Sequence, residues 1–318
     1  MKQAIYYSTS HDCAANLAGE AYLMDLPYDR ILYLWVNDPC IVIGRFQNPH
    51  SECNLPAMEK DGVQLVRRQS GGGAVYHDRG NLCYTLIGNK DEATKEENFD
   101  LIVEALARLG ITSEQSGRND ILMGGKKISG NAFQNTKTKF THHGTLLVTS
   151  DLSVMANYLT PSETKLASKA VKSVASRVGN LKEAKADITV EEVELALEHE
   201  FRKRYGESEV FHINFSEFEA AQENYRLFGD LDLILKNTPP FTHSFTHRFA
   251  WGEVTLNLHV TEDTIQSLTL FTDSLDTTLE ERTQTLLVGV RYEKAQIAAL
   301  EASEPALNEL LGYLLTQL

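Results

Sequence analysis

The densest group of residues that could do chemistry lies at positions 67–78, where two arginines precede three consecutive glycines. The segment reads RRQSGGGAVYHD. Glycine loses more backbone entropy on folding than any other residue, so this run indicates either a strained turn or a backbone that must approach a ligand closely. Successive N–H groups in such a turn can form a concave site for phosphate. The segment is not a Walker A loop, because no Gly-Lys-Ser/Thr follows, and it is not a Rossmann fingerprint, because no helix is expected after the glycines.

A second group of polar residues follows at GRND (117–120) and GGKKISG (124–130). Lys126 and Lys127 are adjacent on an extended chain, so their side chains point to opposite faces. If Lys126 points to solvent, Lys127 points inward, beside Ser129. A buried lysine needs an anionic partner, and a nucleotide phosphate or a substrate carboxylate would supply one.

The four cysteines and the adjacent histidines His142 and His143 give little indication of a metal site. None of the cysteines forms a CxxC pair, and no Cys/His cluster has the spacing of a zinc site. We therefore expect free buried thiols in a reducing compartment. His142 and His143 enter an apolar strand without a third ligand, so we expect them to be structural.

Mixed α and β elements must position these residues. Helix signals include a predicted N-cap at Ser10 and a capping box at Thr189–Glu192. Further helices are expected at 55–61, 99–109, 151–159 and 216–228, and strands at 3–8, 30–36, 40–44, 63–68, 74–77, 81–87, 253–260 and 264–271. The sequence NTPP (237–240) breaks the pattern. We therefore predict a large α+β domain over residues 1–240 and a small α+β module over residues 241–318.

The amino-acid composition excludes several classes of protein. A hydrophobic fraction of 42% and a charged fraction of 23% exclude a mostly disordered chain. No apolar run approaches the roughly 20 residues of a membrane span, and the first residues lack a secretory signal, so we expect a cytoplasmic protein. The 30 basic and 44 acidic side chains give a net charge of −14, which argues against nucleic acid as the main partner but leaves room for a small anionic ligand.

Several segments together resemble a known family. The chain resembles the lipoate–protein ligases in IGRFQNP (43–49), ECN (52–54), RRQSGGGAVYHDRGN (67–81), GRND (117–120), KISG (127–130), HHGTLL (142–147), FAWGEV (249–254) and FTDSL (271–275). The resemblance spans nearly the whole chain. It implies a large mixed-sheet domain of the biotin/lipoate ligase type with a small C-terminal accessory domain.

The resemblance also implies a reaction in two steps. Lipoate and ATP give lipoyl-adenylate and pyrophosphate, and the lipoyl group then passes to a lysine of an acceptor domain. The catalytic and lipoate-binding lysine falls on Lys127. The residues that bind ATP and lipoyl-AMP fall on Lys127, Arg68, Gly73, Ala74, Val75 and Tyr76.

The same resemblance implies Mg²⁺ and acceptor proteins. Asp120 is the candidate carboxylate for Mg²⁺, although a structural role in a turn explains it equally well. The acceptors would be lipoyl domains of 2-oxoacid dehydrogenase E2 subunits and the glycine-cleavage H protein, and nothing demands more than a monomer. The basic stretch Lys165–Arg177 could cover the adenylate and shield it from water.

Three other functions compete with this one. An ATP-independent acyltransferase of the same superfamily uses a cysteine after the lysine motif, but no cysteine lies beyond Cys83. A biotin–protein ligase would carry a GRGR-type signature where this chain has GRFQN. A non-catalytic sensor of lipoate or nucleotide is disfavoured by the presence of Lys127 and Arg68.

Overall fold

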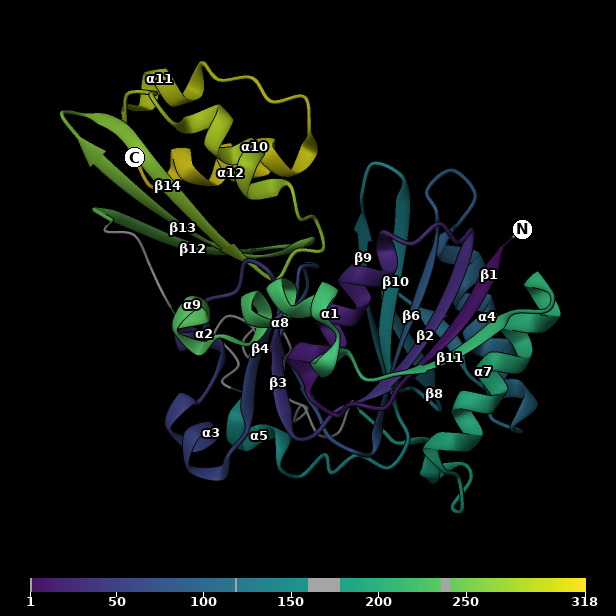
Figure 1. Cartoon of the computed structure of the whole chain (residues 1–318). Helices are drawn as coiled ribbons and strands as arrows, with labels where there is room; N and C mark the ends of the chain where they lie inside the picture. The colour runs from purple at the N-terminus through teal and green to yellow at the C-terminus, as the bar shows by residue number, and fades with distance from the viewer. Residues whose placement is uncertain (1, 118, 160–177, 236–240) are drawn as a thin grey trace.

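An eight-stranded mixed sheet is the centre of the larger part of the chain in the computed structural model, which describes residues 2–117, 119–159, 178–235 and 241–318 (Figure 1). The strand order is β11-β1-β2-β6-β10-β9-β8-β7. β1 pairs in parallel with β2 and β11, and the remaining neighbours are antiparallel. The strands are β1 (Gln3–Ser8), β2 (Arg30–Val36), β6 (Asn81–Asn89), β7 (Glu114–Ser116), β8 (Asp120–Met123), β9 (Lys126–Asn135), β10 (Lys139–Leu147) and β11 (Glu209–Ile213).

Helices cover both faces of this sheet, which explains why β2 and β6 are apolar on both sides. One face packs against α4 (Lys95–Arg108) and α7 (Val190–Tyr205), and the other against α1 (Cys13–Met24) and α8 (Gln222–Gly229) (Figure 1). The predicted capping box at Thr189–Glu192 is confirmed at the start of α7. The predicted N-cap of α1 is wrong: Asp12, not Ser10, accepts hydrogen bonds from the first free N–H groups of that helix.

A three-stranded sheet of order β4-β3-β5 lies beside the large one and carries the glycine-rich turn. Its strands are β3 (Cys40–Ile43), β4 (Gln64–Arg67) and β5 (Val75–His77), and the turn joins β4 to β5. Four short helices surround it: α2 (Pro49–Glu52), α3 (Leu55–Asp61), α5 (Met155–Tyr158) and α9 (Leu231–Leu235). β5 is an edge strand of this sheet, so one edge of its backbone is left without a strand partner there.

The C-terminal part has its own core. The antiparallel strands β12 (His243–Phe249), β13 (Gly252–Thr261) and β14 (Thr264–Thr272) pack against α10 (Leu279–Leu287), α11 (Lys294–Ala298) and α12 (Pro305–Thr316) (Figure 1). The predicted boundary at residue 240 lies outside the described residues and stays a prediction. Together with the larger part, this gives the α+β fold that the sequence predicted.

Other local expectations need correction. The single helix predicted over 216–228 is instead two 3-10 turns, η3 (Phe215–Glu217) and η4 (Glu219–Ala221), followed by α8. The helix predicted over 151–159 is shorter than expected and consists of α5 alone. A third 3-10 turn, η2 (Leu181–Glu183), precedes α7. Strands β11 and β12 were missed: both are edge strands in which no residue is buried, so neither shows the pattern of a strand with a buried face. Across the described ranges, no helix combines the length and apolarity that a membrane span requires.

Candidate functional site

The glycine-rich turn at residues 70–74 is organised by Arg68. Its guanidinium donates to the carbonyl oxygens of Gly71 at 2.8 Å and Gly73 at 2.9 Å, and also to Val42 at 3.1 Å. Its Nε donates to the Ser70 hydroxyl at 3.0 Å. Burial, partly offset by the nearby Glu20 carboxylate, lowers the pKa of Arg68 to about 10, so the side chain stays cationic at neutral pH. Arg68 therefore has a role that sequence reasoning missed, because its fork fixes the backbone of the turn.

The turn is open at one of its three glycines. A Cβ built on Gly73 meets no atom within 4 Å, whereas one built on Gly71 would lie 2.1 Å from the Ser274 carbonyl oxygen. Gly72 has a φ of +99°, in the region that favours glycine. The three glycines thus have different roles. Gly71 permits close contact with the C-terminal part, Gly72 permits the backbone conformation of the turn, and Gly73 leaves open space beside the turn.

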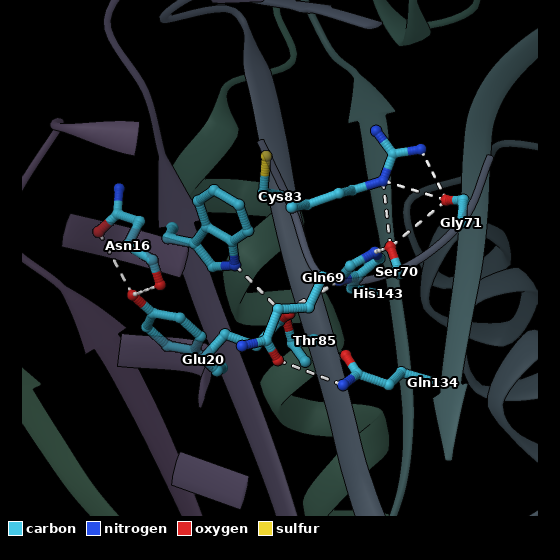
Figure 2. A network of polar contacts seen from close by, with 12 residues as sticks. Asn16, Glu20, Gln69, Ser70, Gly71, Cys83, Thr85, Gln134 and His143 are labelled. Atoms are coloured by element: carbon cyan, nitrogen blue, oxygen red, sulfur yellow. Dashed lines mark hydrogen bonds and ion pairs between the residues drawn. The ribbon is translucent and has the colours of Figure 1, made fainter. Parts of the chain in front are cut away.

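A buried polar network continues from the turn into the large sheet (Figure 2). The Ser70 hydroxyl lies 2.8 Å from Nε2 of His143, and Nδ1 of His143 lies 2.9 Å from both carboxylate oxygens of Glu20. Thr85 donates its hydroxyl to Glu20 at 2.6 Å. Burial alone would raise the pKa of Glu20, but His143, Thr85 and Arg68 together lower it. The network therefore keeps a carboxylate ionised inside the protein.

The order Ser70–His143–Glu20 matches the hydrogen-bond pattern of an acyl-transfer triad. Ser70 is fully buried, however, and its hydroxyl oxygen also accepts the hydrogen bond from Arg68. A nucleophile must reach its substrate, so this arrangement fits a structural network better than a triad. Sequence reasoning took His143 to be structural and did not single out Glu20, although an acidic residue on the apolar face of α1 was a signal that could have been used.

Lys127 lies on a different element from the glycine-rich turn, near the start of β9. Its ammonium is 2.6 Å from Oδ1 of Asp120 on β8, and each side chain is 36% exposed. Its side chain runs back over Gly130, where a built Cβ would lie 3.1 Å from the Lys127 Cε and Nζ atoms. The expectation of a buried lysine is therefore only half right: Lys127 is partly exposed, and the protein itself supplies an anionic partner.

The neighbouring residues explain this placement. The pairing of β8 with β9 shifts register between Ile121 and Leu122, so the simple alternation along β9 is interrupted and Ser129 is fully buried. Lys126 points to solvent, as predicted, and its ammonium lies 2.8 Å from Glu183. Arg118 and residues 165–177 lie outside the described residues.

Val75 and Tyr76 begin the edge strand β5, directly after Gly73 and Ala74. The ring of Tyr76 stacks on that of Tyr158 with a centroid distance of 5.9 Å, and burial raises the pKa of its phenol to about 12. The side chain is therefore neutral and fixed by packing, and the outer edge of β5 can offer main-chain donors and acceptors. Arg68 and residues 73–76 thus form one continuous structure, while Lys127 and Asp120 form a second.

The chain is similar to proteins of known family over most of its length. Residues 12–202 match the family described as the lipoyl protein ligase A/B catalytic domain, and residues 238–308 match the bacterial lipoate protein ligase C-terminus. Lipoate-protein ligase A of Psychrobacter cryohalolentis is 39% identical over an alignment of 310 residues, which covers 94% of this chain and 91% of that protein.

Solved structures show the same relationship. LipL1 of P. falciparum, in complex with lipoate, is 30% identical with a TM-score of 0.86, and 99% of each chain is covered. A bipartite lipoate protein ligase of Thermoplasma acidophilum, described with its E2 lipoyl domain, is 26% identical with a TM-score of 0.65, covering 76% of this chain and all of that one. A lipoate-protein ligase A bound with ATP is 26% identical with a TM-score of 0.60, covering 74% and 96%. This chain therefore belongs to the lipoate–protein ligase family.

Proposed function

We propose that the protein activates lipoate with ATP and then lipoylates a carrier domain. In the first step, the lipoate carboxylate attacks the α-phosphorus of ATP, which gives lipoyl-AMP and releases pyrophosphate. In the second step, the ε-amine of an acceptor lysine attacks the carbonyl carbon of lipoyl-AMP, and AMP leaves. The relatives solved with lipoate and with ATP support the choice of substrates.

The observation that carries this proposal is the ion pair between Lys127 and Asp120. The ammonium is accessible yet held in place at 2.6 Å from a carboxylate, so an anionic substrate group can join or replace that partner. The first step brings two anions together, and fixed positive charge is what the protein must supply. In our proposal Lys127 bridges the carboxylate of lipoate and the α-phosphate. It then stabilises negative charge on the carbonyl oxygen during transfer, and it is not a nucleophile.

The nucleotide would lie along the turn and the edge strand that follows it. Gly73 is open to a ligand, and Ala74, Val75 and Tyr76 continue into the edge strand β5. Main-chain groups there are suited to an adenine edge. Arg68 contributes by fixing the turn and by adding a buried positive charge behind it.

Mg²⁺ would be held mainly by the phosphates of ATP. Asp120 fits as a single carboxylate ligand, because its side chain is partly exposed and lies beside Lys127. When bound, the ion would neutralise phosphate charge.

The acceptor is proposed to be a lipoyl domain of a 2-oxoacid dehydrogenase E2 subunit or the glycine-cleavage H protein. The Thermoplasma acidophilum ligase that is described with its E2 lipoyl domain supports this class of acceptor. We propose that the protein acts as a monomer.

The deciding experiment is lipoate-dependent exchange of pyrophosphate into ATP. We expect exchange in the wild type and in Lys126→Ala, whose side chain pairs with Glu183 on the surface, and near-complete loss in Lys127→Ala. Lys126→Ala is a matched control because it removes an adjacent lysine from the same strand. Equal loss in both variants would contradict the assigned role of Lys127.

Further arms of the experiment separate the competing functions. Lipoylation of an acceptor without ATP would show a transferase, and tight binding of lipoate without turnover on any acceptor would show a sensor. Exchange that depends on biotin instead of lipoate would show a biotin ligase.

A further inference from the structure

Three of the four cysteines, which are far apart in the sequence, come together around His77. Cys13 lies at the start of α1, Cys40 at the start of β3, His77 at the end of β5 and Cys83 in β6. All four side chains are buried, with exposures of 1% for each cysteine and 4% for the histidine. This cluster lies outside the two structures to which we assign the adenylation chemistry.

The donor atoms of this group are close enough to share one ion. The sulfur atoms of Cys13 and Cys40 and a ring nitrogen of His77 all lie within 4.8 Å of one another. The sulfur of Cys83 lies 3.5 Å from Nδ1 of His77. In a tetrahedral zinc site, with Zn–S about 2.3 Å and Zn–N about 2.0 Å, neighbouring donor atoms are roughly 3.5 to 3.8 Å apart. Small side-chain adjustments would therefore bring the donors to binding distance.

His77 offers Nδ1 to the cluster as a nitrogen with a free lone pair. Nδ2 of Asn37 lies 2.9 Å from this atom and donates to it, because Oδ1 of Asn37 already accepts a 2.9 Å hydrogen bond from Nδ2 of Asn16. The ring proton is therefore on Nε2, and Nδ1 is the nitrogen that can bind a cation. A cation bound there would replace the hydrogen bond from Asn37.

Two thiols and one imidazole in a buried setting are donor types that bind zinc in proteins.

We propose that Cys13, Cys40 and His77 bind a zinc-like, thiophilic divalent cation. Each thiol that coordinates the ion releases its proton to solvent, and no oxidation is involved. The site would tie α1 to β3 and β5. It does not depend on the proposed adenylation reaction.

The test measures metal on the full-length protein. The wild type and single variants are produced with added zinc, purified without chelators, and analysed for zinc per chain. We expect about one zinc in the wild type and in Cys53→Ser, and at least a tenfold lower occupancy in Cys13→Ser, Cys40→Ser and His77→Asn. Cys53 is the matched control because it is also buried, yet it lies in a separate cluster beneath α3.

Cobalt gives a second readout in the protein stripped of zinc. We expect Co²⁺ to produce thiolate charge-transfer absorption in the near ultraviolet and intense visible bands in the wild type and Cys53→Ser only. Absence of zinc and of these bands from the wild type would overturn the proposal, as would zinc occupancy in Cys40→Ser equal to that of the wild type. A Cys13–Cys40 disulfide in protein purified without reductant, together with no cobalt spectrum, would show a redox pair instead of a metal site.

A measurement without mutations covers variants that fail to fold. In the partly unfolded wild type, added zinc should slow alkylation of Cys13 and Cys40 but not of Cys53. Equal protection of all three cysteines, or protection of none, would contradict the proposal.

Discussion

The backbone N–H of Gly72 donates a 2.9 Å hydrogen bond to the carbonyl oxygen of Ser274, so the C-terminal part of the chain contacts the glycine-rich turn directly. A second backbone hydrogen bond, from Thr272 to Phe46 at 2.8 Å, lies beside it. The turn that we propose for the nucleotide is therefore also an interface between the two parts of the protein.

Gly71→Ala should destabilise the protein through this interface. The new Cβ would lie 2.1 Å from the Ser274 carbonyl oxygen, and backbone atoms cannot move aside as a flexible side chain can. We expect a loss of about 1 to 3 kcal/mol in the free energy of unfolding, measured by urea denaturation. Gly73→Ala is the control for stability, because its Cβ meets nothing within 4 Å. An equal loss in both variants would rule out the clash as the cause.

Gly130→Ala should reduce activity without reducing stability. Its Cβ would come within 3.1 Å of the Lys127 Cε and Nζ atoms, so the tip of the lysine must shift away from its present position. The lysine tip must move by a few tenths of an ångström. Because a misplacement of about 1 Å can cost about 100-fold in rate, we expect this smaller shift to lower pyrophosphate exchange by roughly three- to tenfold. The free energy of unfolding should change by less than about 0.5 kcal/mol. Gly312→Ala is the control: it lies at an exposed helix position with no neighbour within 4 Å, so pyrophosphate exchange should be unchanged. A wild-type rate of exchange in Gly130→Ala would contradict the prediction.

Arg68→Lys should be strongly destabilising although it keeps the charge. Lysine lacks the planar fork that reaches Gly71, Gly73 and Val42 at once. Buried carbonyl groups would lose their donors, at a cost of roughly 2 to 3 kcal/mol in the free energy of unfolding. Arg79→Lys is a matched control, because Arg79 forms an exposed ion pair with Asp38 that contributes at most about 1 kcal/mol. Similar denaturation midpoints for the two variants would show that Arg68 does not hold the turn.

Glu194→Gln should flatten the pH dependence of stability. Burial, assisted by the nearby Glu191 carboxylate, raises the pKa of Glu194 to about 7. The pKa of Glu194 is therefore higher in the folded state than in the unfolded state, where it is about 4.3. Its contribution to the stability of the folded protein is fully present below the unfolded pKa and is lost as the pH rises through the folded pKa. We expect the variant to match the wild type near pH 4 and to be more stable above about pH 7.5, measured by thermal unfolding.

Glu191→Gln provides the second arm of that experiment. It removes the neighbouring charge but leaves Glu194 titratable, so the pH at which stability falls should move down without disappearing. A stability difference between Glu194→Gln and the wild type that is constant across this pH range would contradict the assignment.

The sequence by itself determined the local elements and the motifs on them. Helix α7 follows its capping box, and β2 and β6 follow their apolar runs, because these signals arise between residues that are neighbours along the chain. The segments around Arg68 and Lys127 were identified for the same reason, and the resemblance of those segments to a known family agreed with the comparisons.

Only the tertiary structure decided what surrounds those residues. Glu20 and His143 are 123 positions apart, and the contact between them depends on α1 packing across a sheet whose strand order the sequence does not state. The same packing gathers Cys13, Cys40 and His77, whose spacing carried no metal signal. A register shift between β8 and β9 set the direction of Lys127. Local patterns report which face of an element is buried, whereas contacts between distant elements depend on how all of those faces pack together.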